Sequence, residues 1–103
     1  MIVRIDAKRL TDAAGMLAAL GEAFGFTAKN RDALADALTH LDDAKSGSGR
    51  VFPGETILLA IDGAADVPKA AAQVKQLAEI AAFANWRRLE KGQPPILAMA
   101  YEV

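Results

Sequence analysis

The side chains with the clearest chemical potential lie in one short stretch, where Asp32, Asp36 and His40 follow one another at intervals of four residues. On a helix, this spacing puts all three on one face. At 1.5 Å rise per residue, the outer two would lie about 12 Å apart, which is too far for both to bind one metal ion. We therefore predict no metal site here, only a face that carries two carboxylates one turn apart.

Catalytic groupings are also weak in this sequence. His40 is the only histidine, and there is no cysteine to act as a nucleophile, a thiolate ligand or half of a disulfide. The two serines, Ser46 and Ser48, lie in a glycine-rich stretch with no second base, which argues against a hydrolytic triad. Residues 62–66 read Asp-Gly-Ala-Ala-Asp, which puts carboxylates where a phosphate loop needs amides and a lysine. We expect a protein that is not an enzyme and needs no cofactor.

Composition limits the partners and the number of domains. Of the 103 residues 52% are hydrophobic, which is enough for one core, whereas two cores would each be too small to fold unaided. We therefore expect a single domain over residues 1–103. The net charge of −1 offers no overall field to nucleic acid or to an anionic membrane. No apolar run reaches the roughly 18 residues of a membrane span, and no signal peptide is evident, so a cytoplasmic location is expected.

The order of apolar patterns predicts the fold class. Short apolar runs without clean alternation are typical of strands in a parallel sheet, and they occur at Met1–Ile5, Thr56–Ile61 and Ile96–Tyr101. Helical patterns separate them, running from Thr11 and Asp12 to Gly25, from Asn30 to near Asp43, and from about Pro68 to Glu90. Strands divided by helices favour parallel pairing. We predict an α/β fold with a small three-stranded parallel sheet packed with helices, and a loop over residues 44–50.

The long third helix keeps one apolar face, which consists of Ala70, Val74, Leu77, Ala81 and Ala84. Beyond that face, we expect Trp86 to be partly buried, with its indole edge at the surface. Arg87 and Arg88 are expected to be solvated in the last turn, where cations complement the helix dipole.

The second helix is the informative element, because it has two distinct faces. Its outer side should carry Asp32, Asp36, Thr39, His40 and Asp43, and its inner side Ala33, Leu34, Ala37, Leu38 and Leu41. The ordinary interpretation is a solvated, charged face. Against it, Asp32 and Asp36 repel each other at a cost of a few tenths of a kcal/mol, and Asp36 lies too far from the helix start to favour the dipole. The alternative is a face that binds a cationic partner, for which both carboxylates must project into water.

One segment resembles a known family. Residues 30–39, with the pattern Asn30-x-Asp32-Ala33-Leu34-x-Asp36-x-Leu38-Thr39, and more loosely residues 5–12, are similar to barstar, the intracellular inhibitor of secreted bacterial ribonucleases. The resemblance implies a short parallel sheet packed on helices, with the second helix plugging the active site of the enzyme. It further implies that Asp32 and Asp36 stand in for substrate phosphates against basic side chains, and that Asn30 and Thr39 are polar contacts. The chain would then be a bacterial ribonuclease inhibitor or antitoxin with a basic protein partner.

Three departures from the family pattern keep a second interpretation open. The loop at residues 26–29 is short and has Lys29 in place of the usual aromatic residues and glycine, and Ala35 stands where a large aromatic is common. Arg87 and Arg88 fall near a position where an acidic contact is expected. The alternative is a barstar-fold interaction or self-assembly module without inhibitory activity, which allows a homo-oligomer formed through the last strand.

Overall fold

The computed structural model describes residues 1–43 and 51–101 of the chain. In these residues, three parallel strands pair in the order β1-β2-β3, so that the middle strand along the chain is also the middle strand of the sheet. Their bounds are β1 Ile2–Asp6, β2 Ile57–Asp62 and β3 Leu97–Tyr101. The predicted parallel sheet is confirmed, and each predicted strand lies within one residue of the observed one.

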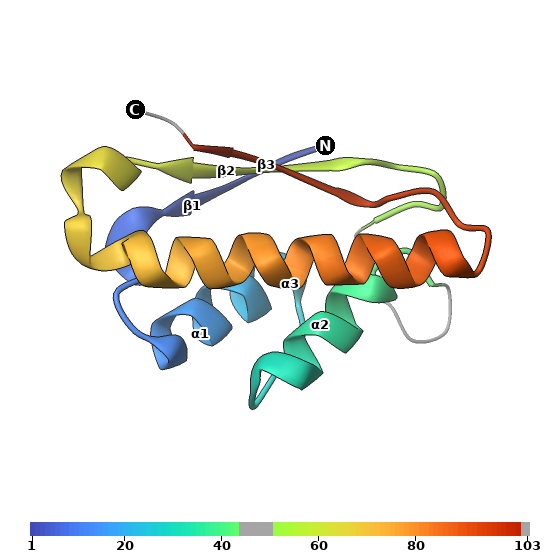
Figure 1. Cartoon of the computed structure of the whole chain (residues 1–103), viewed down its shortest axis with the longest axis horizontal. Helices are drawn as coiled ribbons and strands as arrows, with labels where there is room; N and C mark the ends of the chain where they lie inside the picture. The colour runs from blue at the N-terminus through green and yellow to red at the C-terminus, as the bar shows by residue number, and fades with distance from the viewer. Residues whose placement is uncertain (44–50, 102–103) are drawn as a thin grey trace.

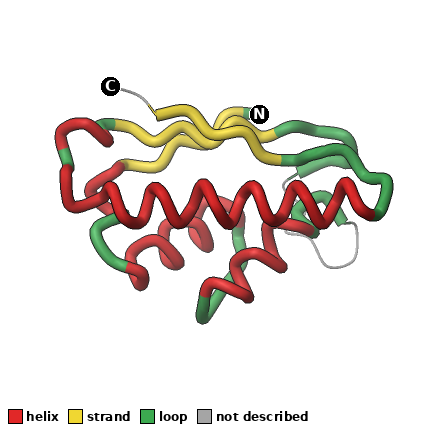
Figure 2. Tube along the Cα trace, in the orientation of Figure 1, coloured by secondary structure: helices red, strands yellow, loops and turns green. Residues whose placement is uncertain are grey.

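Three helices and three short 3-10 turns complete the described structure. The helices are α1 Ala13–Phe24, α2 Arg31–Thr39 and α3 Ala71–Glu90. The turns are η1 Ala7–Arg9, η2 Ala64–Asp66 and η3 Pro68–Ala70. Figure 1 shows the strands in one layer with all three helices on the same side of it, and Figure 2 shows the same separation by colour. The α/β class is therefore confirmed.

Local sequence signals explain where the first two helices begin. The Asp12 side chain accepts a hydrogen bond from the Gly15 amide, and Asn30 Oδ1 accepts one from the Ala33 amide at 2.8 Å. Gly25 then ends α1 with φ of 80°, a left-handed conformation that glycine adopts without strain. The sequence predicts Asn30 and Gly25 in these places and Thr11 as the cap of α1, but the cap of α1 is Asp12, one residue later.

The second helix is shorter than predicted. It ends at Thr39 instead of near Asp43, because His40 already leaves the helical region with φ −112° and ψ 22°. A side chain from outside the helix binds at this end: Arg88 of α3 donates to the Thr39 carbonyl and binds Asp42.

The hydrophobic core lies between the sheet and the helices. Fully buried side chains come from every layer, among them Phe24, Leu34, Leu38, Leu59, Ile61 and Leu77. All five residues of the apolar face predicted for α3 are buried. The opposite face of the sheet is less covered, since Ile2 is 62% exposed. The segment 44–50, predicted as a loop, lies outside the described residues.

Within residues 1–43 and 51–101, no helix is both long enough and apolar enough to cross a membrane.

Candidate functional site

The two aspartates of the α2 pattern are both exposed, one helical turn apart. The opposite side of the helix is firmly seated, because Leu34 and Leu38 are completely buried. The side chain of Asp36 is 65% exposed. Asp32 and Asp36 therefore form a pair of surface carboxylates on a supported helix.

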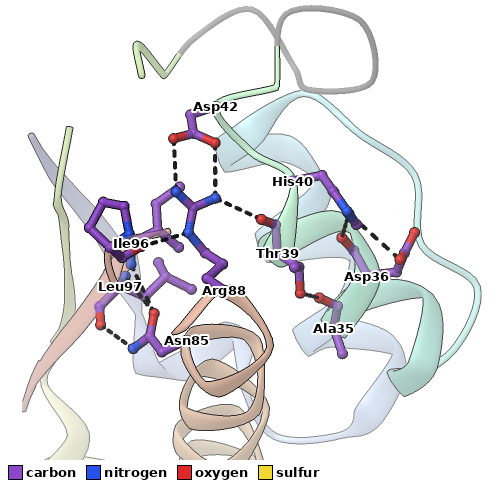
Figure 3. A network of polar contacts seen from close by, with 10 residues as sticks. Ala35, Asp36, Thr39, His40, Asp42, Asn85, Arg88, Ile96 and Leu97 are labelled. Carbon is purple, nitrogen blue, oxygen red and sulfur yellow. Dashed lines mark hydrogen bonds and ion pairs between the residues drawn. The ribbon is translucent and has the colours of Figure 1, made fainter. Parts of the chain in front are cut away.

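Asp36 has two weakly held neighbours within its own chain. Its Oδ1 lies 3.6 Å from Nη1 of Arg87 and 3.6 Å from Nδ1 of His40. His40 Nδ1 makes a closer contact of 2.9 Å with the Asp36 backbone carbonyl (Figure 3). Both carboxylate distances exceed a normal hydrogen bond, and exposed ion pairs are worth only about 0–1 kcal/mol. Arg87 therefore holds the Asp36 carboxylate only weakly.

Asp32 lies beside a hollow between α2 and α3. The hollow has a volume of about 310 Å³, and its lining consists of Arg31, Asp32, Ala35, Glu79, Ile80 and Phe83. Ala35 and Ile80 are nearly buried, whereas Phe83 is about half exposed. Asp32 thus belongs both to the acidic face of α2 and to the rim of this hollow.

Thr39 does not lie on the acidic face, and its predicted role as a partner contact is corrected. Its side chain is 1% exposed, and its Oγ1 donates to the Ala35 carbonyl at 2.7 Å. The reason is that α2 packs against α3 as well as against the core, which widens its buried side to include Ala35 and Thr39 (Figure 3). Ala33 and Ala37, predicted for the inner side, are only half-buried.

Asn30 is exposed, and its side-chain oxygen accepts one hydrogen bond within the chain. Asn30 Oδ1 caps α2 by accepting from the Ala33 amide, so its second lone pair and the two amide hydrogens of Nδ2 remain for further contacts. The cap also fixes the direction in which Asp32 leaves the first turn of α2. A partner contact by Asn30 stays a prediction.

Arg88 was expected in solvent, and that expectation is wrong. The residue is 3% exposed, and its guanidinium makes four hydrogen bonds within the molecule (Figure 3). Two reach the Asp42 carboxylate at 2.9 and 3.0 Å, and the others reach the carbonyls of Thr39 at 2.9 Å and Pro94 at 2.8 Å. The hydrogen bonds from Arg88 hold the pKa of the Asp42 carboxyl below its ordinary value, although partial burial acts in the opposite direction.

A sequence signal for this burial did exist. Leu77, Ala81, Ala84 and Arg88 are spaced by four, three and four residues, so Arg88 continues the buried stripe of α3. A cation at the end of an apolar stripe points to a paired, buried guanidinium. The spacing alone does not name Asp42 as its partner.

The neighbouring residues of α3 form an exposed aromatic and cationic group. Trp86 is 53% exposed and packs against Phe83 with ring centroids 5.9 Å apart, which makes it less buried than expected. The Arg87 guanidinium lies 5.9 Å from the Phe83 centroid, within the range of a cation–π contact. This group adjoins the hollow through Phe83.

One comparison decides the family. The family model described as Barstar (barnase inhibitor) matches residues 1–99. The chain belongs to the barstar family. No curated protein and no solved structure gave a match in the corresponding comparisons.

The residues that the family model matches include those of the acidic face. The match includes the whole of α2, both aspartates and the Arg88 network. Among residues 1–43 and 51–101 of this barstar-family chain, no three histidine, cysteine, aspartate or glutamate side chains gather as metal ligands would.

Proposed function

We propose that this barstar-family chain is a ribonuclease inhibitor or immunity protein. It covers the cationic active site of a bacterial ribonuclease or a related toxin with the acidic face of α2. The observation that carries this proposal is the pair Asp32 and Asp36, exposed one turn apart on a helix whose other side is buried. Their carboxylates offer a basic active site the charge that substrate phosphates would offer.

The support of α2 makes these carboxylates effective ligands. Asn30 caps the start of the helix, Leu34 and Leu38 anchor its middle, and Arg88 binds the carbonyl at its end. A helix held in this way loses little further freedom on binding, so more of the interaction energy remains as affinity. Carboxylates can meet a guanidinium through two parallel hydrogen bonds, and opposite charges speed the encounter.

In this role the chain is a single-domain protein that binds its partner and catalyses no reaction. It requires no cofactor, nucleic acid or membrane, and its partner is a basic protein. A protein that protects the producing cell against its own nuclease has to act in the cytoplasm of a bacterium, as an antitoxin does. We place the chain there on that reasoning.

Barnase is a suitable probe, because the family description names it as the target. Purified barnase hydrolysing RNA is titrated with the wild-type chain and with the variant Asp32→Ala/Asp36→Ala. We expect inhibition by the wild type and its loss in the variant, with unchanged circular dichroism.

The control variant Asp66→Ala/Glu90→Ala removes two exposed carboxylates outside α2, and it should inhibit like the wild type. Full inhibition by the Asp32→Ala/Asp36→Ala variant contradicts the proposal, and lack of inhibition by the wild type excludes barnase as a target.

A second candidate is an interaction module that associates with itself. It is favoured by the exposed apolar side chains of the two edge strands, Ile2 at 62% and Tyr101 at 51%. Edge strands offer unpaired backbone groups to another chain. Light scattering over a range of protein concentrations tests this candidate, and a constant monomer mass excludes it.

A further inference from the structure

The hollow between α2 and α3 is large enough to hold a side chain. Its volume of about 310 Å³ corresponds to roughly ten waters at about 30 Å³ each. It lies at the lower end of the roughly 300–1,000 Å³ typical of ligand pockets. A large side chain from another protein would therefore fit inside it with room to spare.

The apolar part of the hollow consists of three side chains, one of which is small. Ala35 lines it from α2 with 7% exposure, and Ile80 lines it from α3 with 5% exposure. Phe83, which is 47% exposed, forms a wall. These three side chains have no polar group, so the part of the hollow that they line offers water no side-chain hydrogen-bond partner. An apolar occupant would replace that water and cover the open part of Phe83.

The rim of the hollow has a different character. Asp32, Glu79 and Arg31 stand there, and within the described ranges none of them has a hydrogen bond or ion pair through its charged group. Two negative charges against one positive charge favour cationic neighbours around an apolar occupant. Asp32 also belongs to the acidic face of α2, so the hollow and that face form one continuous surface.

We propose that this hollow receives a large apolar side chain, such as leucine, that projects from a basic segment of the protein partner. Basic residues beside that side chain pair with Asp32 and Glu79 at the rim. The inference rests on the proposed function and deepens it: the acidic face attracts the partner, and the hollow adds an apolar anchor. Buried anchors surrounded by a polar rim carry much of the affinity in protein interfaces.

Two peptides of equal charge isolate the anchor. The acetylated, amidated tripeptides Arg-Leu-Arg and Arg-Ser-Arg are titrated into the full ¹⁵N-labelled chain, and the amide signals are followed by NMR. The leucine peptide should shift the signals of Ala35, Ile80 and Phe83 in a saturable way. It should bind at least about tenfold more tightly than the serine peptide, because it alone buries a leucine side chain.

Substitutions of residues that line the hollow provide a second test of the proposal. Ala35→Leu fills the hollow from within and should weaken the leucine peptide about tenfold, while leaving the serine peptide unchanged. Phe83→Ala removes the wall and should have a similar effect. Leu89→Ala is the matched control, since Leu89 is a 56% exposed apolar residue of the same helix outside the lining. The control should bind the leucine peptide as the wild type does.

Three outcomes overturn the anchor: equal binding of the two peptides, equal binding by wild type and Phe83→Ala, or lining signals that move with protein concentration alone. The last result would mean that a second copy of the chain occupies the hollow. The proposed inhibitor function is tested by a separate measurement. If barnase inhibition still depends on Asp32 and Asp36 while both peptides bind equally, the acidic face keeps its role and the anchor does not.

Discussion

Arg88 and Asp42 form a two-pronged ion pair that joins the end of α3 to the segment following α2, with distances of 2.9 and 3.0 Å. Both side chains are largely buried, at 3% and 12% exposure. The same guanidinium donates to the carbonyls of Thr39 and Pro94, so it connects the end of α2 to the chain that leads into β3. The orientation of the acidic face therefore depends on a residue of another helix.

Replacing Arg88 by alanine should strongly destabilise the protein. The change leaves the Asp42 carboxylate and two carbonyls without their donor, and breaking a buried pair from one side costs about 3–5 kcal/mol. Urea unfolding measures the loss of free energy. Arg87→Ala is the control, since the neighbouring arginine is partly exposed in a long ion pair and should matter by no more than about 1 kcal/mol. Equal effects of the two changes would contradict the role given to Arg88.

The lowered pKa of Asp42 predicts the direction of acid destabilisation. Its ordinary value is 3.8, and the hydrogen bonds from Arg88 lower it in the folded state. Between the folded and ordinary values the unfolded chain binds more protons, so stability rises with pH in that window. The stabilisation from this carboxyl is complete above the ordinary value and is lost as the pH falls through the folded one.

The variant Asp42→Asn tests the assignment of that slope. The asparagine has no carboxyl to titrate, so the unfolding free energy of the variant should fall less steeply than that of the wild type below the ordinary value of 3.8. Urea titrations at several acidic pH values provide the comparison. Parallel pH profiles would show that another group is responsible.

Asn85 ties α3 to the beginning of β3. Its Oδ1 accepts from the amides of Ile96 and Leu97 at 2.9 and 3.1 Å, and its Nδ2 donates to the Leu97 carbonyl at 2.8 Å (Figure 3). Asn85→Ala should destabilise the protein, because each buried polar group left without a partner costs about 1–3 kcal/mol. Hydrogen exchange at Ile96 and Leu97 should accelerate in the variant. Unchanged protection of both amides would rule out this role.

Two variants separate the capping role of Asn30 from a role in binding a partner. Asn30→Ala should lower stability by about 1 kcal/mol because the Ala33 amide loses its acceptor. Asn30→Asp keeps an acceptor oxygen and should retain the stability, but it removes the Nδ2 donors that a partner would use. Thermal unfolding and barnase inhibition are measured on both variants. If Asn30→Asp is stable and inhibits fully, inhibition does not depend on the Nδ2 donors of Asn30.

Arg87 opposes the attraction of a basic partner. It lies 3.6 Å from the Asp36 carboxylate and puts a positive charge beside the acidic face. Arg87→Ala should therefore raise the association rate with barnase several-fold at low salt, and the gain should shrink as salt screens the charges. Stopped-flow mixing at several salt concentrations measures it. A slower association in the variant would mean that the partner presents a negative charge to this position.

Local sequence rules decide several elements of this fold. The apolar runs of the three strands, the caps at Asp12 and Asn30 and the glycine that ends α1 are properties of a few adjacent residues. Their backbone preferences are the same in any context. For the same reason, the spacing of Asp32 and Asp36 was enough to place both on one exposed side of α2.

Tertiary packing decided the rest. Thr39 and Ala35 are buried because α3 lies against α2, and the sequence of α2 does not contain the position of its neighbour. Arg88 is buried because Asp42, 46 residues earlier in the chain, reaches it, and only the folded chain brings the two together. The hollow beside Ala35 likewise exists only between two helices. Sequence periodicity fixes which side of an element is apolar, whereas long-range contacts fix which polar side chains remain free to meet a partner.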